Sequence, residues 1–205
     1  MRMNAHAPSL QDFTGIADCD LVVRAIAGRE ENFEELVRRY QRAIVAYVYR
    51  MVGDYDAALD LTQEVFIKVY GSLHRYRSEY KFSTWIYRIA HNAAIDHLRR
   101  PGTGRTEKLE HTSDETGTYE KPLASGALSP EQLSEKAERC AEIEEVVGTL
   151  PSAYKELIVL RHAHDMSYDE IAEVTGLPLG TVKNRIFRAR EAMRTELVRR
   201  GITSM

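Results

Sequence analysis

Three observations predict an all-α fold in which a linker joins two small helical domains. Apolar residues recur at helical spacing almost everywhere outside one central stretch. The strict alternation of a half-buried strand continues nowhere long enough to predict a sheet. The central stretch, residues 101–130, is rich in Gly, Pro, Ser and Thr and has no apolar period, so burial cannot offset the entropy of ordering it. We expect a flexible linker there.

Local signals divide the first block into four helices. Gly28 and Gly53 end the first two, since glycine accepts the left-handed backbone that often closes a helix. Asp54 is expected to cap the third helix, and Ser83 or Thr84 the fourth, because short polar side chains bond the free N–H groups of a first turn. The expected helices cover residues 20–27, 32–52, 54–73 and 83–100, with a basic, aromatic loop at 74–82.

The second block is expected to hold four more helices. Its apolar period is interrupted at residues 148–151, 164–167 and 176–180, where Gly, Pro or Ser occurs. The expected domains are residues 18–100 and 131–200, with the linker at 101–130 and tails at 1–17 and 201–205.

The last two helices of the second block have the layout of a helix-turn-helix. Ser167 and Glu170 have the spacing of a capping box, which starts the first of them. Gly176 permits the left-handed backbone that reverses the chain, Leu177 fills the corner, and Thr181 is expected to cap the second helix. The positions expected to face inward are Ile171, Ala172 and Val174 on the first helix and Val182, Ile186, Ala189, Met193 and Leu197 on the second.

Positive charge is concentrated on the last helix of a chain that is slightly acidic. With 28 Lys and Arg against 31 Asp and Glu, the net charge is -3, which argues against a general polyanion binder. Residues 183–200 hold seven bases and two acids, a local charge of +5, whereas residues 105–139 hold eight acids and five bases. Such a helix fits the DNA major groove, where Arg, Lys and Asn bond base edges and phosphates. The alternative is a solvated basic helix at the end of a small bundle.

Aromatic and basic residues are interleaved along residues 75–100, which span the loop and the fourth helix. Aromatic rings offer stacking faces to unpaired bases while cations follow the phosphates, so the pattern suits single-stranded nucleic acid. Tyr76, in the loop, and Asn92, a polar amide away from the apolar face, are the expected base contacts. The alternative for the apolar positions is a plain core face, formed by Trp85, Ile86, Ile89, Ala90 and Ala93.

The third helix has an acidic face beside apolar residues. Such a face suits docking to a protein partner, and a plain solvated face is the alternative. The polar positions are Asp56, Asp60, Gln63 and Glu64, and the apolar ones are Leu61, Val65, Phe66 and Val69.

Taken in order, three runs of this sequence resemble bacterial sigma factors of the extracytoplasmic-function class (ECF, group IV, sigma-70 family). They are DAALDLTQEVFIKVYGSL at 56–73, FSTWIYRIAHNAAIDHLRR at 82–100 and LPSAYKELIVLRHAHDMSYDEIAEVTGLPLGTVKNRIFRAREAMRTEL at 150–197. The resemblance implies two helical domains, called region 2 and region 4, and a role in promoter-specific transcription initiation, in a stress or envelope response. The partners it implies are core RNA polymerase, through the β′ clamp and the β flap, promoter DNA and an inhibitory anti-sigma factor.

The resemblance also implies a role for three sets of residues. The residues implied to dock on the β′ clamp are Asp56, Asp60, Gln63, Glu64 and Phe66. The residues implied to bind the minus-ten element are Tyr76, Lys81, Trp85, Arg88, Asn92 and Arg99, and of these Tyr76 and Asn92 line a pocket for a flipped base. The residues implied to bind the minus-thirty-five element are Thr181, Lys183, Asn184, Arg185, Phe187, Arg188 and Arg190.

Two other function classes compete with this interpretation. A dimeric helix-turn-helix regulator would explain residues 166–198 equally well, but it would leave residues 76–100 without a use. An enzyme is not indicated, since the sequence has no Gly-rich phosphate loop, nucleophile elbow or HExxH motif. No cofactor or metal site is expected either, because His162 and His164 stand two positions apart and share no face while a helix continues.

The sequence is expected to belong to a cytoplasmic protein without membrane insertion. Its first residues lack the layout of a signal peptide. Its longest apolar stretch, residues 44–49, is far shorter than the roughly 20 residues that span a bilayer. Cys19 and Cys140 lie too far apart in the sequence to suggest a metal knuckle or a redox CxxC pair. We expect both to be ordinary thiols in a reducing compartment.

Overall fold

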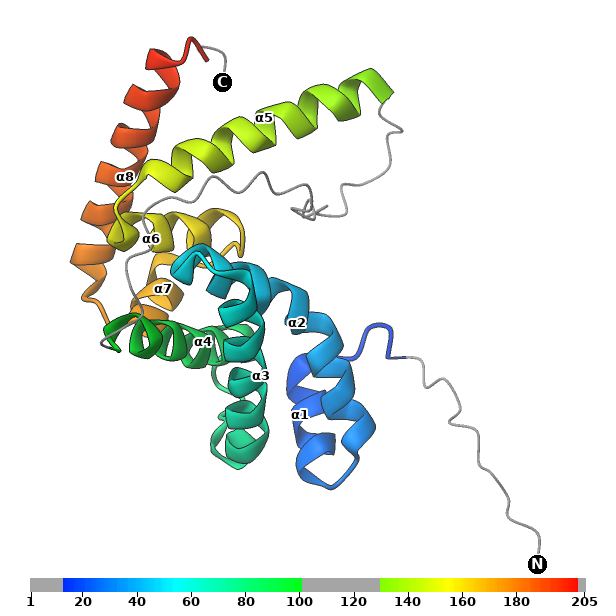
Figure 1. Cartoon of the computed structure of the whole chain (residues 1–205). Coiled ribbons are helices and arrows are strands. Elements are labelled where there is room, and N and C mark those ends of the chain that lie inside the picture. The colour runs from blue at the N-terminus through cyan, green and yellow to red at the C-terminus, as the bar shows by residue number, and fades with distance from the viewer. Residues whose placement is uncertain (1–12, 101–129, 203–205) are drawn as a thin grey trace, which may run out of the picture. The chain divides into compact units, whose positions relative to one another are not determined.

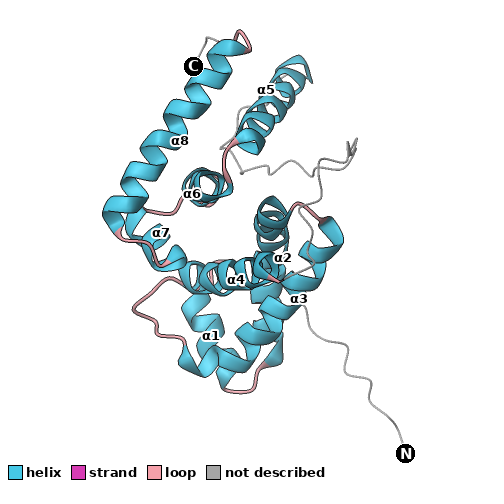
Figure 2. Cartoon of the chain, turned by 60° about the vertical axis from the view of Figure 1, so that its left-hand side comes forward, coloured by secondary structure: helices cyan, strands magenta, loops and turns pink. Residues whose placement is uncertain are grey.

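The computed structural model describes residues 13–100 and 130–202, and every regular element in that part of the chain is a helix (Figure 1 and Figure 2). The all-α prediction is confirmed. The chain divides after Leu98 into two compact units. The N-terminal unit contains α1 (Asp18–Ile26), α2 (Glu30–Val52), α3 (Tyr55–Ser72), the 3₁₀ turn η1 (Leu73–Arg75) and α4 (Phe82–Arg99). The C-terminal unit contains α5 (Pro130–Thr149), α6 (Ser152–His162), α7 (Tyr168–Thr175) and α8 (Leu179–Arg199).

The expected linker lies outside the described residues except for Pro130, which begins α5. None of the described helices combines the length and the hydropathy that crossing a membrane requires.

In the N-terminal unit, α2 packs against both α1 and α3. The helix α4 joins the same core through aromatic contacts with α2. The rings of Tyr47 and Tyr87 meet edge to face with centroids 5.3 Å apart, and the Tyr47 hydroxyl lies 3.5 Å from Nδ1 of His91. The fully buried side chains of α2 are Leu36, Ile44, Tyr47 and Val48.

Capping interactions close α2 and open α3 as the sequence predicts. Gly53 is in the left-handed conformation, with φ of 80°, and its N–H donates to the carbonyl of Tyr49 at 2.8 Å. The Asp54 carboxylate accepts from the backbone N–H of Ala57 at 2.8 Å. A turn of two residues, Gly53 and Asp54, therefore joins two long helices, with a cap at each of the facing ends.

The helix α4 begins at Phe82 and not behind a Ser83 or Thr84 cap, so that prediction was wrong. Phe82 is 2% exposed and packs in the core, which fixes the phase of the first turn. With Phe82 inside, Thr84 also points inward and is only 4% exposed. Its Oγ1 finds no hydrogen-bond partner among the described residues, so it does not serve as a cap.

In the C-terminal unit, α6, α7 and α8 pack against one another, and α5 contacts α6 and α8. Both halves of the predicted capping box of α7 are present: the Glu170 N–H donates to Oγ of Ser167 at 3.2 Å, and the Ser167 N–H donates to the Glu170 carboxylate at 2.7 Å. Gly176 then turns the chain with φ of 70°. The helix-turn-helix thus has the predicted start and corner.

Thr181 does not cap α8, contrary to the prediction. The helix begins two residues earlier, at Leu179, because Pro178 holds φ at -57° and leads straight into the first turn. The backbone N–H of Thr181 donates to the Pro178 carbonyl at 2.8 Å, so Thr181 already lies inside the helix.

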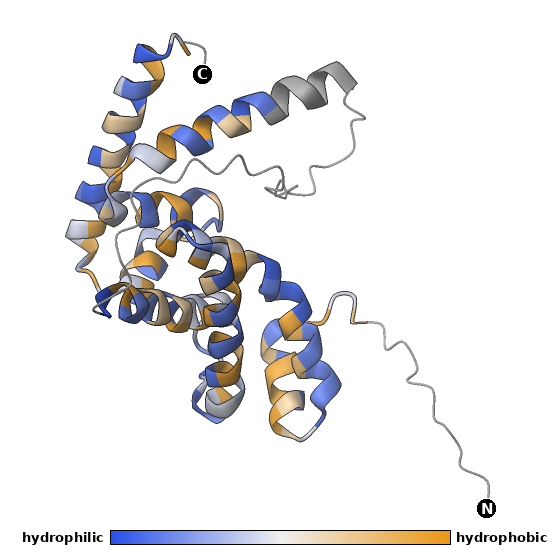
Figure 3. Ribbon diagram, viewed as in Figure 1, coloured by the Kyte–Doolittle hydropathy of each residue, from blue (hydrophilic) through white to orange (hydrophobic). Residues whose placement is uncertain are grey.

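One side of α8 is apolar and the other is polar. In Figure 3, blue and orange bands alternate along this helix, as expected for an amphipathic element. The stripe predicted from the sequence is buried at Val182, Ile186, Ala189 and Leu197, while Met193 is half-buried. On α7, Ile171 and Val174 are buried and Ala172 is half-buried.

Candidate nucleic-acid interface

The first half of α8 presents a polar and basic face to solvent. Burial of Val182, Ile186 and Ala189 on the opposite side turns this face outward. Phe187 stands out among its residues because its large ring is 65% exposed. The exposed members of the predicted set are Lys183, Asn184, Phe187, Arg188 and Arg190, and the half-buried ones are Thr181 and Arg185.

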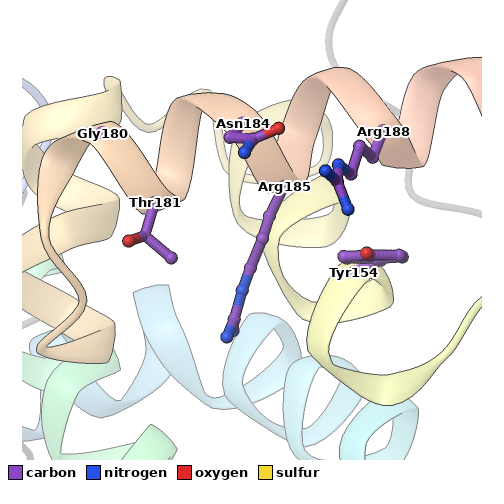
Figure 4. Close-up of a pocket in the computed structure, with 6 residues that line it drawn as sticks. All are labelled: Tyr154, Gly180, Thr181, Asn184, Arg185 and Arg188. Atoms are coloured by element: carbon purple, nitrogen blue, oxygen red, sulfur yellow. The ribbon is translucent and has the colours of Figure 1, made fainter.

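A shallow notch of about 410 Å³ separates the start of α8 from α6. Thr181 and Arg185, one helical turn apart, point into the space beneath α8, and Arg188 points toward the ring of Tyr154 (Figure 4). Tyr154 lies on α6 and was not singled out from the sequence, because nothing in its local pattern places it beside α8. The notch is lined by Tyr154, Gly180, Thr181, Asn184, Arg185 and Arg188.

The second half of α8 is neutralised by carboxylates. Arg194 pairs with Glu191 at 3.3 Å, and Arg199 pairs with Glu196 at 2.6 Å. Arg200 donates to Glu196 at 2.9 Å and to Glu145 of α5 at 2.7 Å. The hydrogen bonds from Arg199, which has the larger effect, and from Arg200 lower the pKa of Glu196 to about 2.

The first half of α8 has no such pairing. Within residues 138–202, where side chains are described, no carboxylate pairs with Lys183, Arg185 or Arg188. The charge that α8 can offer to an anionic ligand therefore lies at its N-terminal end.

Arg190 contacts a histidine of α6. Its guanidinium lies 3.4 Å from Nε2 of His162, and burial together with the charge of Arg190 lowers the pKa of His162. His162 is the last residue of α6, so the helix does end before His164. The part of the chain that the structure describes contains no group of three His, Cys, Asp or Glu side chains placed to hold a metal ion.

Three rings form an aromatic cluster where the loop meets α4. We use this name for Tyr76, Phe82 and Trp85, whose ring centroids lie 5.6 to 5.8 Å apart. The Tyr76 hydroxyl donates to the carbonyl of Tyr80 at 2.6 Å, which folds the loop back on itself. Tyr76 and Trp85 are half-buried, so each keeps part of its surface open to solvent.

From the aromatic cluster a polar stripe runs along α4. Trp85, Arg88, Asn92 and Arg99 follow one another at steps of three, four and seven residues, which return to the same face of a helix. Arg88, Asn92 and Arg99 are exposed, as is Lys81 just before the helix. The core-face alternative holds for Ile86, Ala90 and Ala93, which are buried, whereas Trp85 and Ile89 are only half-buried.

The acidic face of α3 is exposed and includes an apolar residue that the sequence did not single out. Ile67 is 72% exposed, whereas the predicted Phe66 is 8% exposed and packs in the core. Ile67 follows Gln63 by four residues and therefore lies on the same face. We call Asp56, Asp60, Gln63, Glu64 and Ile67 the α3 face, and all five are exposed.

Comparison with known proteins assigns both units. Residues 36–103 match the model of Sigma-70 region 2, and residues 140–193 match that of Sigma-70, region 4. The chain is 35% identical over 170 residues to the ECF RNA polymerase sigma factor SigW of Bacillus subtilis, covering 83% of this chain and 91% of that protein. The chain belongs to the ECF sigma factors. This sigma factor is also 37% identical over 182 residues to the ECF RNA polymerase sigma-E factor of Escherichia coli, over 87% of this chain and 93% of that one.

Solved structures share the fold of this sigma factor. CnrH, solved in complex with the cytosolic domain of CnrY, has a TM-score of 0.60 at 24% identity, covering 88% of this chain and 96% of that one. RpoE of Bartonella quintana, solved with the anti-sigma factor NepR, has a TM-score of 0.61 at 21% identity, covering 82% and 98%. The α3 face and the aromatic cluster fall inside the region 2 match, and the first half of α8 falls inside the region 4 match. The helix α1 precedes both matches.

Proposed function

We propose that this sigma factor binds core RNA polymerase through its N-terminal unit and reads the two promoter elements with separate surfaces, one on each unit. The observation that carries the proposal is the division of α8 into an apolar buried side and a polar side beside Asn184, whose Lys183, Arg185 and Arg188 pair with no carboxylate among the described residues. That arrangement suits a helix lying in a major groove.

The first half of α8 reads the minus-thirty-five element. Arg188 and Asn184 can form paired hydrogen bonds with base edges, each worth about 1–3 kcal/mol of discrimination against a wrong base. Lys183 and Arg185 bind phosphates on either side, and Phe187 can contact a thymine methyl group. Tyr154, across the notch, adds a hydroxyl that can bond the DNA backbone.

The aromatic cluster and the polar stripe of α4 read the minus-ten element as single-stranded DNA. The open surfaces of Tyr76 and Trp85 can stack on unpaired bases. Asn92 has an amide that can bond a base edge, while Lys81, Arg88 and Arg99 follow the phosphates. Stacking makes this surface tolerant of sequence, and the amide supplies the preference.

Energetics require that the polymerase takes part in melting. Opening about ten base-pair steps, at a mean of about 1.4 kcal/mol each, costs on the order of 14 kcal/mol. Stacking returns about 1–3 kcal/mol per base, and the aromatic cluster can take only one or two bases. The isolated protein therefore should not melt promoter DNA.

The α3 face docks on the β′ clamp of core polymerase. Its carboxylates suit a basic partner surface, and Ile67 supplies an apolar anchor among them, in place of the buried Phe66. The C-terminal unit docks on the β flap.

The polymerase carries out catalysis, and the sigma factor acts in the cytoplasm.

An anti-sigma factor controls the protein in this proposal, in a stress or envelope response. The support is the family membership and the fold shared with RpoE of Bartonella quintana, which was solved with the anti-sigma factor NepR. A protein inhibitor of this kind acts by covering the surfaces that bind polymerase and DNA.

Run-off transcription with sigma-free bacterial core polymerase tests the proposal. Genomic fragments of the source organism should yield discrete transcripts only when the protein is added, and mapping their starts would define both promoter elements. If no transcript appears and the protein does not bind core, the proposal fails and the dimeric-regulator alternative must be tested by measuring the oligomeric state.

A matched pair of arginine variants separates the two surfaces. Arg188→Ala should lower transcription tenfold or more from a promoter that depends on the minus-thirty-five element, without weakening core binding. Arg194→Ala removes the same charge from the same helix, but from an arginine already paired with Glu191, and should have little effect. Loss of core binding in Arg188→Ala would contradict the separation of roles.

A further inference from the structure

We propose that Asp18, the first residue of α1, is a positioning residue for the minus-ten surface. It acts through Tyr40 of α2, whose ring supports the aromatic cluster. The inference rests on the proposed role of the aromatic cluster in reading the minus-ten element. Nothing in the region 2 match covers Asp18, because the match begins at residue 36.

The first step is the pair of contacts that Asp18 makes with α2. One carboxylate oxygen of Asp18 accepts from the Tyr40 hydroxyl, and the other accepts from Nη1 of Arg39 at 2.8 Å. Asp18 and Arg39 are each only about a quarter exposed, so solvent screens this ion pair less than it would a surface pair. Burial and the hydrogen bond to Asp18 raise the pKa of Tyr40, which therefore stays a donor.

Arg39 fixes the segment that leads into α1. Its Nη1 also donates to the carbonyl of Ile16 at 2.8 Å, and its Nη2 donates to that of Phe13 at 3.0 Å. Its Nε donates to the buried carboxylate of Glu35 at 2.7 Å. The guanidinium thus holds the start of α1 in one place against α2, and with it the Asp18 carboxylate.

The second step leads from Tyr40 to the aromatic cluster. The ring of Tyr40 meets that of Phe82 edge to face, with centroids 5.3 Å apart and an interplanar angle of 68°. Phe82 in turn contacts Tyr76 at 5.7 Å and Trp85 at 5.8 Å. Edge-to-face packing depends on ring orientation, so a shift of Tyr40 displaces the two rings proposed to stack on bases.

The helix α1 also lies next to the loop itself. It contacts η1, the turn that leads directly into Tyr76. Burial raises the pKa of Tyr76, and the electrostatic influence of Cys19 and Asp18 raises it further. The contact of α1 with η1 therefore adds to the support that Asp18 gives the minus-ten surface through Tyr40.

The test compares promoters that differ by one base in the minus-ten element, transcribed by holoenzyme assembled with the full chain. The readout is a discrimination ratio, defined as initiation on the parent promoter divided by initiation on the substituted one. Asp18→Ala and Tyr40→Phe should each lower this ratio about tenfold, equivalent to about 1.4 kcal/mol, the scale of a hydrogen bond to a charged group. The double variant should be no lower than Asp18→Ala alone, because both changes remove the same contact.

Asp20→Ala is the matched control. Asp20 stands in the same first turn of α1 and is exposed, so this variant loses the same charge without touching Tyr40. Its discrimination ratio should stay at the parent value.

The outcomes separate positioning from mere stabilisation. If the variants lower initiation on all promoters equally and leave the ratio unchanged, Asp18 supports the fold only and the inference is wrong. If Asp18→Ala does not fold, Tyr40→Phe decides, since it keeps the ring and loses only the hydroxyl. If Tyr76→Ala also leaves the ratio unchanged, the proposed minus-ten role has failed as well, which distinguishes the two failures.

Discussion

Replacing Thr84 with valine is expected to stabilise the N-terminal unit. Thr84 is 4% exposed, and its Oγ1 makes no hydrogen bond within the described part of the chain. A buried hydroxyl without a partner costs about 1–3 kcal/mol. Valine has nearly the same shape, is also branched at Cβ and differs little in helix propensity. The free energy of unfolding should therefore rise by about 1–2 kcal/mol.

The sign of this change tests how α4 begins. If Thr84 capped the helix, as its sequence context suggests, the same substitution would remove a cap and lower the free energy of unfolding by about 0.5–2 kcal/mol. The two interpretations therefore differ in direction, which a single unfolding experiment can resolve.

Urea denaturation followed by fluorescence is the assay. The chain has one tryptophan, Trp85, which lies in the N-terminal unit, so the signal reports that unit alone. The midpoint should move to higher urea with the slope of the transition unchanged. Ser83→Ala is the control, since Ser83 was the other candidate cap, and it should shift stability by no more than about 0.5 kcal/mol. A lower midpoint for Thr84→Val would refute the reasoning.

Three further predictions concern other parts of the molecule. Ser167→Ala breaks the capping box and should lower the stability of the C-terminal unit by about 1 kcal/mol, visible in circular dichroism but not in Trp85 fluorescence. Hydrogen bonds, chiefly the one from Arg38, lower the pKa of Glu35 below its ordinary value of 4.5. The ionised Glu35 carboxylate therefore stabilises the fold fully above pH 4.5, and this stabilisation is lost as the pH falls through the lowered pKa. Glu35→Gln should therefore cost stability at neutral pH, and urea titrations should show the difference shrinking in acid. Ile67→Asp should weaken binding to core polymerase about tenfold, measured by fluorescence anisotropy, while the unfolding midpoint stays in place because the side chain is exposed.

Features set by neighbours in the chain could be predicted from the sequence. The left-handed Gly53 and Gly176, the Asp54 cap and the capping box of α7 each depend on residues within four positions. Such interactions form in any context that permits the helix, so the pattern alone identifies them.

Features decided by packing could not. On α3, apolar residues stand at so many positions that the pattern does not say whether Phe66 or Ile67 faces inward, and contact with α2 decides it. The same holds for Thr84, which is turned inward by the burial of Phe82. Tyr154 beside α8 could not be found from local patterns either, because the contact joins residues more than 25 positions apart.

Within the described part of the chain, the ion pairs of α8 are confined to its second half, so only the first half of the helix offers positive charge to DNA. Glu191 pairs with Arg194, Glu196 pairs with Arg199, and Glu145 pairs with Arg200, which directly follows the helix, so these arginines release few counterions when DNA binds. Lys183 and Arg185, which pair with no carboxylate among the described residues, together with Arg190 correspond to about three phosphate contacts, each contributing about -0.9 to the slope of log K against log salt. The promoter affinity of region 4 should thus follow ionic strength like that of a small ligand with about three charges, although α8 itself carries six basic residues.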